Sequence, residues 1–504
     1  MLATIASSTL TGVDGCPVRV EVHVANGLPG FSLVGLPDMS CREARDRVRA
    51  ALVSSGATWP MKRITVNLAP GGVLKTGAGL DLPIALGVLM ASGQLPEDGP
   101  SLGAFGELGL DGSVRPVPGA LSLADSVEAE MVLVPAADAA VAGLVAGDRV
   151  RSVGRLSDVV DALVHGQPWP EPATPAIGVD DGQPEPDLAE VKGQRAARTA
   201  LEFAAAGGHH LLLVGPPGSG KTMLARCIGG LLPALRPEEA LEATRVHSAA
   251  GLPLPAGGLL TRPPFRSPHH SASMASLVGG GSGQARPGEV SCATCGVLFL
   301  DELGEFAPSV LDSLRQPLEE GVVRVARSGG TTVQPAHILV VAAMNPCPCG
   351  VGGRTGCRCS AAVRARYARR VSGPLLDRLD LMVHVDRPTP SELLGGLGEP
   401  SSVVASRVAR VRALARRRGV RCNAELSGEA LDRFAPLETE AQRVLADALA
   451  SGRLSGRGLR RVRCLARTVR DLDDGGDSLR VDDVRCALSL RAHPPVEVHD
   501  DLGR

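Results

Sequence analysis

The feature of this sequence that most restricts its fold is a glycine-rich loop between an apolar strand and a helix. Residues 211–214 form a fully apolar run, and residues 221–232 show a helical periodicity that Pro233 ends. The loop fits the pattern G-x-x-x-x-G-K-[ST] and consists of Gly215, Pro216, Pro217, Gly218, Ser219, Gly220, Lys221 and Thr222. This context predicts a phosphate cradle, because backbone N–H groups and a helix N-terminus converge on the loop. We expect Lys221 to reach the β- and γ-phosphates of ATP and Thr222 to hold Mg²⁺.

Two further apolar runs bring in the residues that hydrolysis needs. Residues 296–300 and 338–342 predict buried strands of a parallel sheet that is covered on both faces. Asp301 and Glu302 follow the first strand, and we expect Asp301 to hold Mg²⁺ through water while Glu302 polarises the attacking water. Asn345 follows the second strand, where it either orients the same water or is an ordinary turn residue.

A proline-rich segment divides the chain. At about 150 residues per domain, 504 residues indicate about three domains. Residues 167–187 carry six prolines among acidic and small residues, which is typical of an extended linker. Residues 1–166 mix alternating runs with helical patterns and predict an α+β domain, residues 188–388 carry the βα units, and residues 389–504 keep only helical periodicity. The predicted fold class is therefore a multidomain α/β protein with an all-α C-terminal domain.

The composition excludes several classes of protein. Hydrophobic residues make up 44% and charged residues 21%, which excludes a disordered, collagenous or coiled-coil chain. No apolar stretch reaches the roughly 18 residues that span a bilayer, and the N-terminus lacks a signal-peptide pattern, so we expect a cytoplasmic protein without a membrane partner. Aromatic residues make up only 2%, too few to stack successive bases, so any nucleic acid must be bound by arginine–phosphate contacts.

Four of the twelve cysteines gather in a short segment. In a chain of this length cysteines favour thiols or metal ligands over a disulfide framework. Cys347 and Cys349 form one C-x-C pair, and Cys357 and Cys359 form a second across a glycine-rich loop. Four thiolates so close fit a tetrahedral Zn²⁺, although C-x-x-C is the commoner spacing, and free thiols or a redox pair are the alternatives.

Seven motifs in one order carry a family resemblance. They are residues 191–194 (VKGQ), 215–222 (GPPGSGKT), 265–270 (FRSPHH), 296–306 (GVLFLDELGEF), 314–319 (LRQPLE), 344–350 (MNPCPCG) and 372–380 (SGPLLDRLD). Together they resemble the Mg-chelatase-like AAA+ ATPases, specifically the ComM/YifB branch, over nearly the whole chain. The resemblance implies an AAA+ P-loop core and a homo-oligomeric ring, usually a hexamer, with ATP at each subunit boundary. It also implies that Arg378 is an arginine finger acting on the neighbour's ATP and that Arg457 is a lid arginine touching the γ-phosphate in cis; a surface cation is the alternative for each.

The N-terminal region resembles the Lon-type, S5-like domain that this family carries in front of its AAA+ core. Residues 75–85 follow a strand predicted at residues 64–68 and look like the loop that bears the Lon nucleophile. A Lon-type peptidase needs a serine activated by a lysine. Gly79 stands at the serine position, so Lys75 has nothing to activate. We expect a scaffold or substrate-guiding domain without peptidase activity.

Arginines indicate what such a ring would move. Residues 322–333 predict a hairpin that resembles the pre-sensor hairpin of related AAA+ proteins, where Arg324 and Arg327 would meet a phosphodiester backbone; a solvated structural hairpin is the alternative. Residues 407–421 and 453–470 hold two arginine runs without an acidic residue among them, which favours phosphate binding.

These observations predict an AAA+ ATPase that couples ATP hydrolysis to remodelling of single-stranded or branched DNA. Branch migration or helicase activity is what the family resemblance implies. One alternative is the remodelling of proteins, in which DNA would not stimulate turnover. Another is an accessory ATPase for metal insertion into a tetrapyrrole, which would need separate large subunits and would leave the N-terminal domain unexplained.

Overall fold

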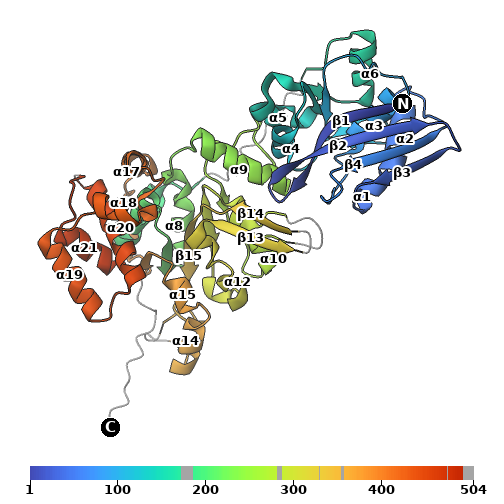
Figure 1. Ribbon diagram of the computed structural model, residues 1–504. Helices are drawn as coiled ribbons and strands as arrows, with labels where there is room; N and C mark the ends of the chain where they lie inside the picture. Colours follow the sequence, from blue (N-terminus) through green and yellow to red (C-terminus); the bar gives the residue numbers. More distant parts are fainter. Residues whose placement is uncertain (172–184, 281–285, 328–329, 353–356, 474, 492–504) are drawn as a thin grey trace.

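The computed structural model describes residues 1–171, 185–280, 286–327, 330–352, 357–473 and 475–491 (Figure 1). Most of the predicted linker therefore lies outside the described residues. The chain forms a seven-stranded sheet near its N-terminus, a five-stranded sheet in its middle and a group of helices towards its C-terminus. The first and last of these parts lie at opposite ends of the molecule (Figure 1). Among the described residues, no helix has the length and apolar character needed to span a membrane.

The N-terminal part is an α+β unit, as predicted. Its strands are β1 (Leu2–Thr11), β2 (Asp14–Ala25), β3 (Gly30–Val34), β4 (Arg63–Ala69), β5 (Leu102–Ala104), β6 (Glu107–Leu108), β7 (Val114–Arg115), β8 (Met131–Pro135) and β9 (Val150–Val153). Its helices are α1 (Met39–Arg42), α2 (Ala44–Ser54), α3 (Asp81–Ala91), α4 (Ala120–Ser126), α5 (Ala139–Ala146) and α6 (Leu156–His165). The large sheet has the order β3-β4-β2-β1-β5-β8-β9, and β6 pairs with β7. Alternating valines of β2 such as Val20 and Val22 are buried against helix α3, which is apolar after its first residue, Asp81.

The middle part is built on a parallel sheet, also as predicted. Its strands are β10 (Leu211–Val214), β11 (Phe265–Arg266), β12 (Val297–Leu300), β15 (Leu339–Met344) and β16 (Leu381–His384), in the order β11-β12-β15-β10-β16. Every neighbouring pair is parallel, so the carboxyl ends of β12, β15 and β10 lie side by side at one edge. An antiparallel hairpin of β13 (Val322–Arg327) and β14 (Gly330–Pro335) stands beside this sheet.

Helices cover both faces of the parallel sheet. The helices of this part of the chain, not all of which touch the sheet, are α7 (Arg195–Gly207), α8 (Lys221–Cys227), α9 (Pro237–Ala250), α10 (Met274–Val278), α11 (Glu289–Cys292), α12 (Pro308–Asp312), α13 (Pro317–Glu320), α14 (Ala361–Ala368), α15 (Gly373–Leu376) and α16 (Pro390–Leu394). Leu211 and Leu213 pack with α7 on one face, while Leu212 and Val214 pack with α12 on the other. The helix expected over residues 221–232 is wrong in its end: α8 stops at Cys227, and a 3-10 turn follows because two consecutive glycines weaken the helix.

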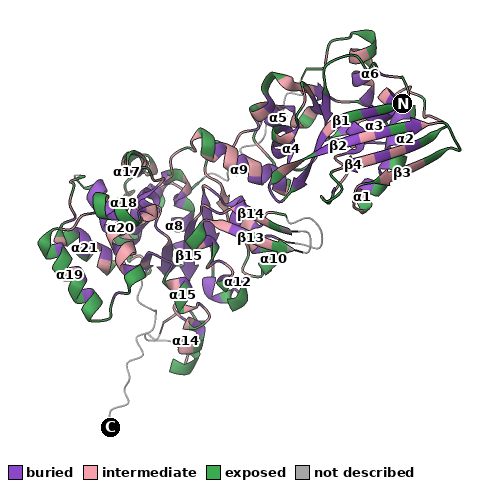
Figure 2. Cartoon of the chain, in the orientation of Figure 1, coloured by how far each residue is buried: buried purple, intermediate pink, exposed green. Residues whose placement is uncertain are grey.

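The C-terminal part is helical, as predicted. Its helices are α17 (Ser401–Arg417), α18 (Gly428–Phe434), α19 (Thr439–Ala450), α20 (Gly456–Leu472) and α21 (Val481–Ser489). Their apolar faces join the same core as α7 and one face of the parallel sheet, and Figure 2 shows these faces buried and the outer faces exposed. The helical part is thereby fixed against the middle part.

Helix α9 joins the N-terminal part to the middle part. Val246 and Ala249 of α9 share an apolar cluster with α4 and α5. The backbone N–H of Gly119 donates to the carbonyl of Ser248 at 2.8 Å, and Arg245 pairs with Asp125 at 2.8 Å. The N-terminal unit therefore docks on the helix that precedes the glycine-rich segment 251–287, of which residues 281–285 lie outside the described part of the chain.

Candidate nucleotide site

The glycine-rich loop connects β10 to α8 at the carboxyl edge of the parallel sheet. Gly220 caps α8 with φ +90°, a conformation that glycine adopts without strain. A Cβ on Gly215 would lie 2.1 Å from the carbonyl oxygen of Val385, so only glycine fits there. Ser219 is buried, and its Oγ has no hydrogen-bond partner among the described residues. A buried hydroxyl without a partner in such a loop is consistent with a ligand that completes the site.

Lys221 points back into this loop. Its Nζ donates to the carbonyls of Gly215 at 2.8 Å and Pro216 at 2.9 Å, and to Oδ1 of Asn345 at 3.2 Å. Burial lowers the pKa of the Lys221 ammonium, while the carboxylates of Asp301 and Glu302 oppose that shift. A buried cation in contact with neutral acceptors has charge left to neutralise, which suits a phosphate.

Two oxygen ligands for a hard cation meet beside the loop. Thr222 Oγ1 donates to Oδ2 of Asp301 at 2.9 Å, and the N–H of Glu302 donates to Oδ1 of the same carboxylate at 2.8 Å. A hydroxyl and a carboxylate are the donors that Mg²⁺ takes in phosphate sites, with water and phosphate oxygens in its other positions. The residues present therefore fit the Mg²⁺ ion expected there.

Glu302 lies at the end of β12 in a strained backbone conformation. Its φ is +51°, which is uncommon for a residue other than glycine and typical of functional sites. Its side chain is 54% exposed, and Oε2 lies 3.2 Å from Nδ1 of His270. The imidazole of His270 stacks on His269 at a ring distance of 4.1 Å. The carboxylate is therefore reachable by water and held by one histidine.

Together these contacts gather residues that are far apart in the sequence. The loop follows β10, Asn345 follows β15, and Asp301 with Glu302 follows β12, which are three adjacent strands. A crevice outside the carboxyl ends of parallel strands is the usual place for a ligand in such a sheet.

Comparisons with known proteins agree with this architecture. Three family models match: "Subunit ChlI of Mg-chelatase" over residues 20–138, "Magnesium chelatase, subunit ChlI" over residues 187–393, and "Magnesium chelatase, subunit ChlI C-terminal" over residues 398–491. An uncharacterized protein of Mycobacterium tuberculosis, Rv2897c, is 45% identical over 96% of this chain and 97% of its own. The uncharacterized protein YifB of Escherichia coli is 40% identical over 99% and 98%, and the competence protein ComM of Haemophilus influenzae is 42% identical over 94% of each.

The chain belongs to the Mg-chelatase-like AAA+ ATPase family, in its ComM/YifB branch. Membership of this family suggests ATPase activity with ATP and Mg²⁺ and an oligomeric assembly.

The two arginines singled out in this AAA+ chain meet at one carboxylate. Arg378 pairs with Glu319, donates to the carbonyl of Pro374 at 2.6 Å and has a side chain only 9% exposed. Arg457 lies 3.2 Å from the same Glu319, with its side chain 70% exposed. Within the described residues, no hydrogen bond or ion pair joins either arginine to the glycine-rich loop of its own chain. The structure thus brings these two arginines together and leaves them apart from Lys221.

Two residues of this site were missed by reasoning from the sequence. His270, the partner of Glu302, and Glu319, the partner of both arginines, lie in the motifs FRSPHH and LRQPLE. The motifs marked the segments, but only the folded chain shows which side chain each residue contacts.

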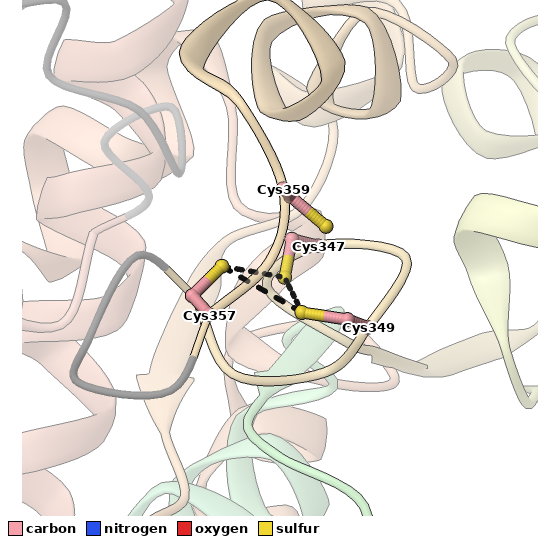
Figure 3. Close-up of side chains that lie close together, drawn as sticks. All are labelled: Cys347, Cys349, Cys357 and Cys359. Carbon is pink, nitrogen blue, oxygen red and sulfur yellow. Dashed lines mark hydrogen bonds between the residues drawn. The ribbon is translucent and has the colours of Figure 1, made fainter.

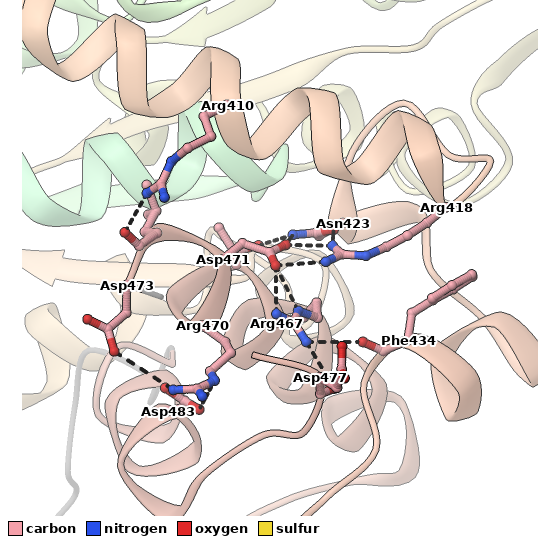
Figure 4. A network of polar contacts seen from close by, with 12 residues as sticks. Arg410, Arg418, Asn423, Phe434, Arg467, Arg470, Asp471, Asp473, Asp477 and Asp483 are labelled. Carbon is pink, nitrogen blue, oxygen red and sulfur yellow. Dashed lines mark hydrogen bonds and ion pairs between the residues drawn. The ribbon is translucent and has the colours of Figure 1, made fainter. Parts of the chain in front are cut away.

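The arginine runs of the C-terminal helices are not uncompensated, which corrects the inference drawn from their sequence. Acidic residues outside the two runs supply the missing charge, most of them from other elements and one, Asp471, from helix α20 itself. The pairs are Arg407 with Glu202 and Glu399, Arg418 with Asp471, Arg421 with Glu425, Arg461 with Asp380, Arg463 with Asp432 and Arg467 with Asp471. Figure 4 shows the buried part of this network around Asp471. Arg417 and Arg453 make no ion pair within the described residues and remain candidates for phosphate contact.

The hairpin expected at residues 322–333 is present as β13 and β14, although residues 328–329 and the side chain of Arg327 lie outside what the structure describes. It projects beside the N-terminal part (Figure 1). Arg324 is 51% exposed and lies 3.2 Å from Glu320. Its single exposed pair leaves the guanidinium accessible.

The four cysteines converge next to the nucleotide site. Figure 3 shows their sulfur atoms directed towards one another from both arms of the loop. All four sulfur atoms lie within 4.8 Å of one another, and Cys347 is buried while Cys349 is exposed. Hydrogen bonds from the backbone N–H groups of Val351 and Arg358 lower the pKa of the Cys349 thiol from 9.0 to about 6.

Proposed function

We propose that the chain assembles into a hexameric ring that couples ATP hydrolysis to the remodelling of single-stranded or branched DNA. The observation that carries the hydrolytic part is the pair of contacts Thr222–Asp301 and Lys221–Asn345 at one edge of the parallel sheet. These contacts join the phosphate loop, which follows β10, to the ends of β15 and β12, the next two strands on one side of it.

In this proposal each residue of the edge has one task. When bound, Mg²⁺ neutralises phosphate charge and orients the oxygens of the leaving group. Thr222 and Asp301 hold that ion, and Lys221 exchanges its contacts with loop carbonyls for the phosphates. Glu302 accepts the proton of the attacking water, which Asn345 orients, and His270 holds the carboxylate until it does so.

The proposal places a second set of residues at the subunit boundary. Arg378 acts in trans on the ATP of the next subunit, and Arg457 acts in cis on the γ-phosphate. Both arginines must leave or share Glu319 to do this. Glu319 therefore pairs with both arginines and keeps their guanidinium groups close together when they do not contact phosphate.

DNA as the substrate is supported by cationic residues and by one relative. ComM of Haemophilus influenzae is named a competence protein. Arg417 and Arg453 lie on the C-terminal helical part without an ion pair among the described residues, and Arg324 is half exposed on the hairpin. Arginine–phosphate contacts of this kind give binding that weakens as salt rises.

The N-terminal domain, residues 1–166, is a scaffold without peptidase activity in this proposal. Lys75 is fully buried, and its Nζ donates to the carbonyl of Pro70. Burial lowers the pKa of Lys75, but Gly79 offers no hydroxyl for it to activate.

The test is the ATPase rate of the purified ring with single-stranded, duplex and four-way junction DNA, and with an unfolded protein. The proposal expects DNA to stimulate turnover, and DNA affinity to fall steeply with salt. Arg417→Ala and Arg453→Ala should each reduce the slope of log affinity against log salt concentration by about 1, the amount expected for one lost phosphate contact. Arg463→Ala, which removes an ion-paired arginine, should leave this slope unchanged.

Stimulation by the unfolded protein alone would instead identify a protein remodeller. Stimulation by neither ligand, together with turnover dependent on a metal-chelatase subunit, would identify an accessory ATPase for metal insertion. Failure to hydrolyse ATP under every condition would overturn the proposal as a whole.

A further inference from the structure

Two C-x-C pairs lie between β15 and α14, in the part of that segment that the structure describes, residues 345–352 and 357–360. The two pairs face each other (Figure 3). The Sγ atoms of Cys347 and Cys349 are 3.4 Å apart, those of Cys349 and Cys357 are 3.6 Å apart, and those of Cys347 and Cys357 are 3.9 Å apart. Cys359 completes a set of four whose sulfur atoms all lie within 4.8 Å.

We propose that these four cysteines bind one structural Zn²⁺ as a tetrathiolate. Four sulfur atoms at the usual Zn–S distance of about 2.3 Å stand about 3.8 Å apart along the edges of a tetrahedron. The three separations among Cys347, Cys349 and Cys357, 3.4, 3.6 and 3.9 Å, lie on both sides of that edge length. Four protein thiolates also fill the coordination of Zn²⁺, which is the pattern of structural rather than catalytic zinc sites.

The same distances oppose the alternatives left open by the sequence. A disulfide needs two sulfur atoms about 2.05 Å apart, whereas the shortest of these separations is 3.4 Å. Unliganded thiols have no reason to converge, because four sulfur atoms that close gain little from S–H hydrogen bonds and repel one another as thiolates. A polynuclear iron–sulfur cluster places its own iron and sulfide between the cysteines and would hold them further apart.

The backbone around the cysteines is arranged as in a metal-binding turn. The N–H of Gly352 donates to Sγ of Cys347 at 3.1 Å, and Gly350 and Gly352 have φ of +81° and +72°. Such N–H donors stabilise thiolate charge and orient metal ligands. On the other arm, Ser360 caps the start of α14 directly after Cys359.

The position of the site gives the ion a mechanical task. Asn345, which contacts Lys221, lies two residues before Cys347, and a Cβ on Gly350 would lie 2.3 Å from Cδ of Pro217 in the phosphate loop. The zinc would hold this turn against the phosphate loop at one end and fix the start of α14 at the other. The ion would thereby fix the position of Asn345 at the end of β15 without itself contacting a bound nucleotide.

The primary experiment measures metal in the full chain, expressed without a metal-binding tag and dialysed against metal-free buffer. Inductively coupled plasma mass spectrometry should find about one zinc per chain, as expected of a tightly held structural ion. Exchange with Co²⁺ should give the intense visible bands of tetrahedral thiolate coordination. The proposal would be overturned by a chain that contains no zinc and in which all four of these thiols react with a thiol reagent. Iron held at these cysteines would overturn it as well.

A pair of matched double variants then assigns the ligands. Cys349→Ser with Cys357→Ser should reduce bound zinc at least tenfold and abolish the Co²⁺ spectrum. Cys16→Ser with Cys295→Ser removes two partly exposed cysteines outside the cluster and should retain both. Equal zinc in the two double variants would refute the ligand assignment.

Because the metal content and the spectrum of the unmodified chain are read without ATP, they stand even where a variant fails to fold. They also separate this proposal from the proposed function, since a ring inactive on DNA can still hold zinc. An active ring without zinc would refute the zinc site alone.

Discussion

The carboxyl edge of the parallel sheet, where the candidate nucleotide site lies, and the C-terminal helices differ in how fully their charged side chains are paired. At the edge, the carboxylate of Glu302 is 54% exposed and has one histidine partner, and Lys221 contacts neutral carbonyls. In the C-terminal helices, Asp471 is fully buried between Arg418 at 2.5 Å and Arg467 at 2.6 Å (Figure 4). Loosely partnered charge is free to act on a ligand, whereas charge that is buried and paired can only stabilise or destabilise the fold.

Arg378 is the strongest test of this distinction between loosely partnered charges and buried, paired charges. It is nearly buried and paired with Glu319, as a structural arginine would be, yet the proposal makes it act on a neighbour's ATP. Arg378→Ala should lower kcat by about 10³- to 10⁵-fold, the range of an arginine finger. Steady-state ATP hydrolysis measures this, with Arg315→Ala as a control at a nearby exposed arginine that pairs with Asp312.

Mixing subunits separates the two roles of Arg378. A ring of Arg378→Ala and Glu302→Gln chains should regain part of the activity, because some boundaries combine an intact finger with an intact base. If the mixture stays inactive while each variant still assembles, Arg378 has only a structural role. The buried and paired charges of both regions would then serve the fold alone.

Glu302 tests the exposed side of the comparison. Glu302→Gln should keep ATP affinity while kcat falls by about 10²- to 10⁴-fold, since the amide cannot accept the proton of water. Binding of a fluorescent ATP analogue and single-turnover hydrolysis measure the two effects. The control is Glu305→Gln, a carboxylate in the following turn that pairs with Arg370 at 3.0 Å and should hydrolyse ATP normally. Unchanged turnover in Glu302→Gln would remove this residue from the chemistry.

Asp471 tests the buried side. Asp471→Asn leaves Arg418 and Arg467 without their shared counter-charge and should destabilise the C-terminal helices by about 3–5 kcal/mol. Asp473→Asn is the matched control, because Asp473 is 68% exposed and lies 3.8 Å from Arg470, so its loss should cost about 0–1 kcal/mol. Urea denaturation followed by circular dichroism measures both. Equal midpoints for the two variants would show that burial of the pair contributes nothing.

The same contrast explains what could be predicted from the sequence. The phosphate loop, Asp301, Glu302 and Asn345 each follow an apolar strand, and parallel strands bring such positions to one edge whatever the rest of the chain does. Glu202 pairs with Arg407 across 205 positions, and no local pattern links them. The short strands β11 and β16 were missed for a related reason: β11 has only two residues and β16 is not buried throughout as β10 and β12 are, so only their neighbours make them strands.

His209 lies where the two regions meet, and it extends the comparison to pH. It is fully buried beside β10, where its Nε2 lies 2.8 Å from Oγ1 of Thr468 in α20. Burial lowers the pKa of His209 from 6.5 to about 4, and Asp380 opposes this shift while His210, Arg412 and Arg461 add to it.

At pH values between these two pKa values, His209 is protonated in the unfolded chain and neutral in the folded chain. Stability should therefore fall as the pH drops from 6.5 towards 4 and be insensitive to this residue above that window. His209→Gln keeps a polar atom near Thr468 but cannot titrate, so its denaturation midpoint should vary less with pH than that of the unmodified chain. The control replaces the exposed His269 by Gln, and identical slopes in the two variants would show that the buried imidazole of His209 does not contribute to the pH dependence of stability.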